Sequence, residues 1–265
     1  MVEAKKTGTE VAVYDPGSDA GAGLENVERS EYAIPFLYVL DAKSPQCKPV
    51  KNGGLGYAPG SIYNTATNEA YDGDTGVPFV PVHRDHNFGE WIRRNPDGTG
   101  GGFVGIRSPE DPLVLDLRAK AGAFGKLYTD DNHELVETFY LYGLIIPADA
   151  PMGVLIPFKS TGIKRYRNFM TRAMGIQYQG ANGPVKPPLW AHRWRLTTAM
   201  EQKGQNSWYN FRLALEKEPP IESRLKLTDP VYLQGRELYE VIKSGRVVVK
   251  HEDAQKPSEG DEVPF

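Results

Sequence analysis

The sequence contains a single cysteine, Cys47, so no disulfide can form within the chain. Disulfides persist mainly in oxidising compartments, and their exclusion here fits a reducing one. No run approaches the roughly 18 apolar residues that a membrane-spanning helix needs. Residues 1–23 also lack the apolar core of a signal peptide. We therefore expect a soluble, cytoplasmic protein.

Acidic residues are absent from one long stretch, Phe158 to Met200, although the whole chain carries a net charge of −3. Its cations are Lys159, Lys164, Arg165, Arg167, Arg172, Lys186, Arg193 and Arg195, and aromatic side chains are interleaved with them. Cations bind a phosphate backbone and aromatic faces stack on unpaired bases, so this composition indicates a surface for single-stranded nucleic acid. A basic helix and strand without a ligand would have the same composition.

Glycine and proline are frequent, at 28 and 21 residues, which favours many short strands joined by turns. Runs of β-branched and aromatic residues predict strands at Ser61–Thr65, Val77–His83, Asn87–Arg93, Gly102–Ile106, Val136–Ile146, Met152–Pro157, Ala191–Ala199 and Ser207–Leu215. Capping residues and stop glycines predict helices from Ser160 or Thr161 to about Met174, and from Asp229-Pro230 to about Ser244. The predicted fold class is mainly β with a few helices (α+β), arranged as a barrel or sandwich.

The two ends of the chain differ in composition from the middle. Residues 1–23 are rich in Gly, Ala and charged residues, so we expect a flexible segment, followed by one domain over residues 24–250. Residues 251–265, HEDAQKPSEGDEVPF, contain five acids against one lysine, which predicts a disordered tail. Its tip is either a solvated end or a linear motif in which the acids and Phe265 bind a partner.

This tail resembles the C-terminal tip of bacterial single-stranded DNA-binding proteins, in which acids precede an apolar residue, proline and phenylalanine. The corresponding residues here are Asp261, Glu262, Val263, Pro264 and Phe265. The body, in segments such as AIPFLYVLDAKSPQ and GQNSWYNFRL, resembles bacteriophage-encoded single-stranded DNA-binding proteins. The resemblance implies an OB-fold-like barrel with added helices, a role in DNA replication or recombination in the host cytoplasm, and partner proteins recruited by the tail. The body lacks the Gln- and Gly-rich linker of the bacterial protein, so its oligomeric state stays open.

An OB-type barrel binds single strands with aromatic platforms in a basic groove, and stacking contributes roughly 1–3 kcal/mol per base. The candidate stacking residues are Trp91, Trp190, Trp208, Tyr63 and Phe88. The candidate phosphate contacts are Lys159, Lys164, Arg165, Arg167, Arg172, Arg193, Arg195, Arg84, Arg93 and Arg212. Alternation along the strands places Trp194 and Phe211 in the core and pairs Trp208 with Arg212 on the outer face. For any single aromatic residue a core position is still favoured, because large aromatics are usually mostly buried.

The sequence contains no strong pattern of catalytic or metal-binding residues. His83 and His86 have a spacing that a metal pair could use, but further ligands are not evident nearby and a surface turn is favoured. The glycine runs lack the Lys-Ser/Thr ending of a phosphate-binding loop. We therefore expect a non-enzymatic protein without metal or cofactor. A virion structural or assembly protein is the main alternative, and a DNA-processing enzyme such as a nuclease or recombinase is a further one.

Overall fold

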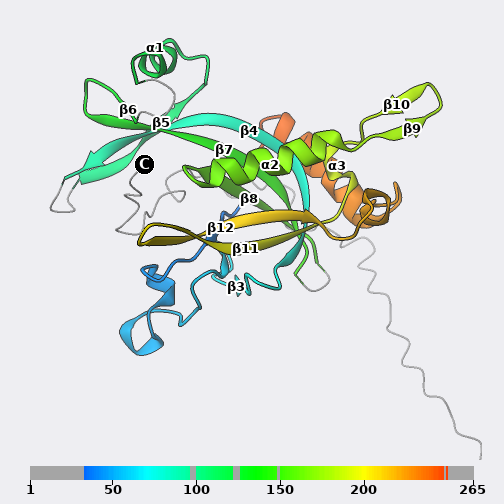
Figure 1. Cartoon of the computed structure of the whole chain (residues 1–265), viewed down its shortest axis with the longest axis horizontal. Coiled ribbons are helices and arrows are strands. Elements are labelled where there is room, and N and C mark those ends of the chain that lie inside the picture. The colour runs from blue at the N-terminus through cyan, green and yellow to red at the C-terminus, as the bar shows by residue number, and fades with distance from the viewer. Residues whose placement is uncertain (1–32, 96–99, 122–125, 148–149, 248, 250–265) are drawn as a thin grey trace, which may run out of the picture.

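The computed structural model describes residues 33–95, 100–121, 126–147, 150–247 and 249 (Figure 1). A curled seven-stranded antiparallel sheet has the order β12-β11-β4-β7-β6, with β5 added to β4 and β8 added to β7. Its strands are β4 (Val77–Arg94), β5 (Gly100–Arg107), β6 (Leu127–Tyr128), β7 (His133–Ile145), β8 (Met152–Lys159), β11 (Trp194–Lys203) and β12 (Asn206–Leu215). The predicted α+β class, with an OB-like half-barrel, is confirmed.

Smaller elements complete the described part of the chain. Strands β1 (Leu37–Val39), β2 (Ile62–Asn64) and β3 (Ala70–Tyr71) form a three-stranded sheet, and β9 (Tyr178–Gly180) pairs with β10 (Gly183–Val185). The helices are α1 (Pro112–Ala121), α2 (Gly162–Gly175) and α3 (Pro230–Lys243), and the short 3-10 turn η4 (Leu189–Ala191) precedes β11. No helix of the described residues is long and apolar enough to cross a membrane.

The largest departure from the sequence-based expectation is β4. Two strands and an intervening turn are predicted here, but the chain forms one strand of 18 residues. The pairing of β4 with β7 shifts its register between Pro81 and His83, and the strand continues on both sides of this shift. His83 pairs with Tyr142 and His86 with Phe139 of β7, so the prediction of a surface turn at these histidines is wrong.

Helix α2 lies between β8 and β12, the strands at the two ends of the curled sheet. Tyr166 packs against Phe158 of β8 with ring centroids 5.6 Å apart, and the side-chain amide of Asn210 in β12 donates to Thr161 Oγ1 at 3.2 Å. Phe169 meets the ring of Trp194 edge to face at 4.8 Å. The helix therefore closes the open side of the half-barrel over the main apolar core.

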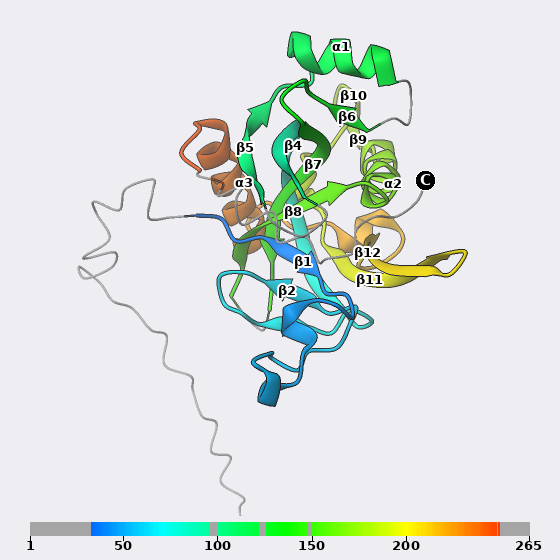
Figure 2. The ribbon, with the colours of Figure 1, turned by 90° about the vertical axis from the view of Figure 1, so that its left-hand side faces the viewer.

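Helix α3 lies on the opposite side of strands β4, β7 and β8 from α2, as Figure 2 shows. Its Leu238 and Ile242 pack on a cluster that includes Tyr140 and Tyr142 of β7. Asp229 caps the helix as the sequence predicts, because its carboxylate accepts from the backbone N–H of Val231 at 2.8 Å.

Replacing this cap should lower stability measurably. Asp229→Ala removes the acceptor at the first turn of α3, and we expect the free energy of unfolding to fall by about 1 kcal/mol in urea denaturation. Asp229→Asn keeps a capping oxygen and should retain most of that stability. Equal losses in both variants would show that the carboxylate charge, rather than the cap, matters.

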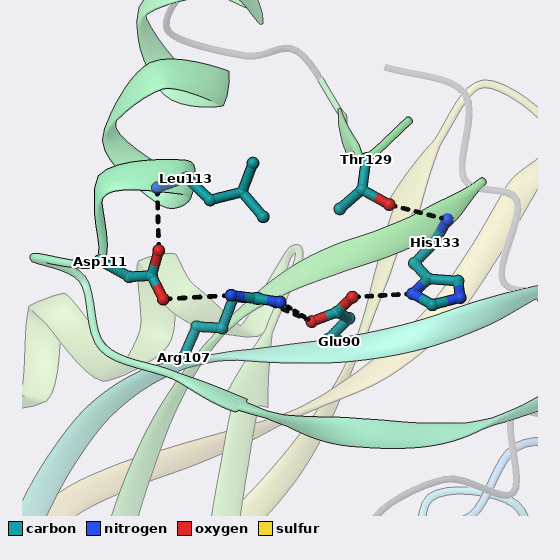
Figure 3. A network of polar contacts seen from close by, with 6 residues as sticks. All are labelled: Glu90, Arg107, Asp111, Leu113, Thr129 and His133. Carbon is teal, nitrogen blue, oxygen red and sulfur yellow. Dashed lines mark hydrogen bonds and ion pairs between the residues drawn. The ribbon is translucent and has the colours of Figure 1, made fainter. Parts of the chain in front are cut away.

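The outer ends of β4 and β7 form an arm with β5, β6 and α1, and this arm has its own small core. Phe88, Val114, Leu127 and Leu135 are buried together there. A polar network lies beside this core (Figure 3): Glu90 accepts from the Arg107 guanidinium at 2.6 Å and contacts His133 Nδ1 at 2.7 Å. Arg107 in turn reaches Asp111 at 3.2 Å, just before α1. The network joins three strands to the start of the helix.

Candidate nucleic-acid interface

Helix α2 places its apolar and its basic residues on different faces, as the sequence spacing predicts. Tyr166 and Phe169 are 3% and 2% exposed, whereas Lys164 and Arg167 lie on the surface. No Asp or Glu occurs within the helix. Its exposed face therefore carries cations and no acid of its own.

The acid-free stretch is less basic in the folded protein than in the sequence, because acids from other segments neutralise four of its arginines. The pairs are Arg165–Glu201 (2.5 Å), Arg195–Glu216 (2.7 Å), Arg193–Asp229 (4.0 Å) and Arg172–Glu218. All four acids follow the stretch in the chain, in β11 or after β12. These predicted phosphate contacts are thus engaged within the protein, and only the fold reveals their partners.

Four other predicted phosphate contacts are exposed and form no ion pair among the residues that the structure describes. They are Arg84, Lys164, Arg167 and Arg212. Arg84 of β4 lies close to Tyr166 of α2: burial raises the pKa of this phenol, and the nearby guanidinium acts against that rise. A cation of β4 therefore lies close to α2, the helix that carries Lys164 and Arg167.

The two remaining predicted cations are placed differently. Lys159 is half-buried at the end of β8, next to the start of α2. Arg93 lies on the arm, where it donates to Asn132 at 2.9 Å and covers the Tyr128 ring at 4.5 Å. Arg93 is thus engaged locally, on a separate part of the molecule from α2.

Three of the predicted stacking residues are buried, which corrects the sequence-based assignment. Tyr63 is 7%, Phe88 2% and Trp91 9% exposed. The Tyr63 hydroxyl donates to Asn68 at 2.5 Å, and the Trp91 ring packs on Phe103 at 4.9 Å. None of the three offers an open ring face to a base, because each ring is covered by neighbouring side chains.

The remaining tryptophans differ in their accessibility. Trp194 is 1% exposed and Phe211 7%, so both belong to the core as the alternation predicts. Trp190 and Trp208 are half-buried. Trp208 lies on β12 two residues from the buried Asn210, on the strand that also carries the exposed Arg212. Both half-buried tryptophans keep part of their surface open to a ligand.

An aromatic stack that sequence reasoning missed lies next to Arg84 and Arg167. The His86 ring stacks on Phe139 at 4.0 Å with an interplanar angle of 6°, and Phe139 stacks on Tyr166 at 4.7 Å. The Arg167 guanidinium lies 5.8 Å from the Phe139 ring centre. His86 and Phe139 come from paired strands far apart in the sequence, so no local pattern could indicate their contact.

A cavity of about 430 Å³ opens between α2, β4 and the segment that leads into η4. It brings together Arg84, Lys186 and Trp190, which come from separate places in the chain. Its other lining residues are Val82, His83, Met170, Ala173, Met174, Ile176, Pro187, Pro188, Leu189, His192, Trp194 and Tyr239. None of them is an acid, so the cavity combines positive charge with apolar and aromatic walls.

A second cavity of about 530 Å³ lies at the C-terminal end of α2. Its walls are largely apolar, and the one cation that lines it, Arg172, already pairs with Glu218. This cavity therefore suits an anionic ligand less well than the one at Arg84.

The predicted partner-binding residues, Asp261 to Phe265, lie outside the described residues. In a comparison with known families, a family model described as "Pam3 phage gp34-like protein" matches residues 4–248. None of the curated proteins and none of the solved structures matches the chain.

Proposed function

The chain belongs to the Pam3 phage gp34-like protein family, and on the premise that it is a phage protein we propose that it binds single-stranded DNA without reading its sequence. The role we propose is protection of single strands during phage DNA replication or recombination. The observation that carries the proposal is the grouping, on α2 and the nearby part of β4, of cations that no acid among the described residues pairs with, beside partly exposed aromatic rings. A phosphate backbone needs the cations, and unpaired bases need the ring faces.

The proposed binding surface starts at the outward face of α2, with Lys164 and Arg167, and continues to Arg84 on β4. Beside it lie the His86–Phe139 stack and the cavity at Trp190. The curled sheet supports this surface rigidly, because α2 is anchored in the core through Tyr166 and Phe169. Such a surface can hold a flexible strand through its backbone and stack its bases with little regard to their identity.

We propose that the protein acts in the host cytoplasm without catalysing a reaction. The acidic tip Asp261–Phe265 is the segment that we propose recruits replication or recombination proteins. The support for this role is its sequence alone: carboxylates suit a basic patch on a partner, and Phe265 suits an apolar pocket.

Binding of fluorescent oligo-dT, compared with duplex DNA of equal length across a salt series, tests the proposal. We expect preference for oligo-dT, quenching of tryptophan fluorescence, and an affinity that falls steeply as salt rises. No binding at low salt would overturn the proposal and favour a structural role in the virion. Cleavage of the labelled DNA with Mg²⁺ would instead indicate a DNA-processing enzyme.

A further inference from the structure

We propose that the cavity between α2, β4 and the Lys186–Trp190 segment takes one unstacked base of the bound strand, with its phosphate held at the rim by Arg84 and Lys186. This inference rests on the proposed function and names the part of the ligand that enters this site. Its volume of about 430 Å³ falls within the range of roughly 300–1,000 Å³ that is usual for small-molecule sites.

The charge of the cavity selects an anionic ligand. Arg84 and Lys186 are exposed cations at its border, and no Asp or Glu lines it. His192 lies in its wall, where burial and the nearby Arg224 lower the pKa of the imidazole and favour its neutral form. His192 also contacts the Tyr178 hydroxyl at 2.7 Å, so it is held in place as a neutral group. The two cations are thus the charges that a phosphate would meet.

The walls provide a fixed aromatic plane opposite adaptable side chains. Trp190 packs on Tyr239 of α3 with ring centroids 5.0 Å apart, and Gly235 leaves room for it, since a Cβ there would lie 2.9 Å from the Trp190 Cβ. Across the cavity, α2 contributes Met170 and Met174. A rigid indole facing flexible thioethers can enclose flat rings of different size, as a sequence-tolerant base site requires.

The floor of the cavity is an unpaired segment of the β4 edge. Strand β11 pairs with β4 only at Val77–Phe79, and β5 pairs with it only from Phe88 onward. Between them, residues 82–84 line the cavity without a partner strand on that side within the described part of the chain. Backbone N–H and C=O groups at such an edge can bond to the polar edge of any base.

Photochemical cross-linking of the full chain to oligo-dT carrying a single 5-iodouracil tests the assignment. Mass spectrometry of the cross-linked peptides should locate the base in the Lys186–Trp190 segment, or at Tyr239 or His83 across the cavity. Cross-links confined to Trp208 and its hairpin would overturn the inference while leaving single-strand binding intact. Failure of oligo-dT to bind at all would instead overturn the proposed function.

A matched pair of variants gives a second readout. Met174 lines the cavity and is 57% exposed, whereas Met200 lies on the β11–β12 hairpin and is 60% exposed. Met174→Glu places a carboxylate where the base would enter, and we expect about tenfold weaker oligo-dT binding together with loss of the cross-link. Met200→Glu makes the same change in charge at a similarly exposed site and should bind within about twofold of the unaltered chain. Equal losses in the two variants would contradict a base site in the cavity.

Discussion

Replacing Lys164 and Arg167 together by glutamate is expected to weaken oligo-dT binding by about 100-fold at low salt. Both side chains are exposed on α2, and no acid among the described residues neutralises them. Each phosphate contact that is lost also releases fewer counterions on binding, and for a single strand it contributes about 0.7 to the slope of log K against log salt. The salt dependence should therefore become shallower by roughly 1.4 in log K against log salt for two lost contacts. Fluorescence anisotropy across a salt series measures both quantities.

The control for this variant carries the same charge change elsewhere. Lys51 and Lys226 are exposed and lie outside α2, in the segments before β2 and before α3. Their double replacement by glutamate should leave the salt slope nearly unchanged, because only the general field of the protein becomes more negative. If the control lost affinity and slope as severely as the α2 variant, binding would depend on net charge and not on this helix.

The ion pairs also predict that two arginines of the stretch Phe158 to Met200 contribute differently to oligo-dT binding. Arg195 is as prominent in the sequence as Arg167, but its guanidinium pairs with Glu216 at 2.7 Å. Because this charge is already compensated, we expect Arg195→Gln to weaken oligo-dT binding by less than about threefold. A loss as large as that from Arg167→Gln would indicate that DNA displaces Glu216 and that the paired arginines belong to the interface after all.

The features that the sequence predicts correctly are those that depend on neighbouring residues. The two faces of α2 follow from helical spacing, and the cap at Asp229 follows from a local side-chain acceptor next to Pro230. The core positions of Trp194 and Phe211 follow from alternation along paired strands. In each case the pattern that decides the prediction lies within a few residues in the sequence, even where the contacts themselves, such as Phe169 with Trp194, join distant segments.

The features that the sequence does not predict depend on contacts between distant segments. Glu201 neutralises Arg165, and Phe139 supports His86, only because strands and helix meet in the fold. Helix α1 escapes prediction for another reason: Val114, Leu117 and Ala121 pack on the core of the arm, but the neighbouring Leu115 is 54% exposed, so the apolar residues of this short helix are not confined to one face. The assignment of Phe88 to stacking fails because α1 covers that ring, and α1 is the helix that was not expected.

Glu90→Ala should be the most destabilising single change among the charged residues considered above. Glu90 is 5% exposed, and its removal leaves Arg107 and His133 without the carboxylate that both contact. Breaking a buried pair from one side costs about 3–5 kcal/mol, and because both partners are partly exposed we expect a loss of about 3 kcal/mol. Urea denaturation measures the loss, and hydrogen exchange should show it first in β5 and α1, which the network joins.

The pH dependence of this loss follows from the pKa of Glu90. Burial raises that pKa, but hydrogen bonds from His133 and Arg107 outweigh burial and hold it below its ordinary value. A depressed pKa in the folded state contributes stability that is complete above the unfolded value of about 4.3 and disappears as the pH falls through the folded pKa. The difference between the unaltered chain and Glu90→Ala should therefore be largest near neutral pH and shrink in acid.

Glu137→Ala is the matched control, since Glu137 pairs with His86 at 3.0 Å but its side chain is 27% exposed. It should cost less than about 1 kcal/mol, and an equal loss in the two variants would show that burial of Glu90 does not set the strength of its network.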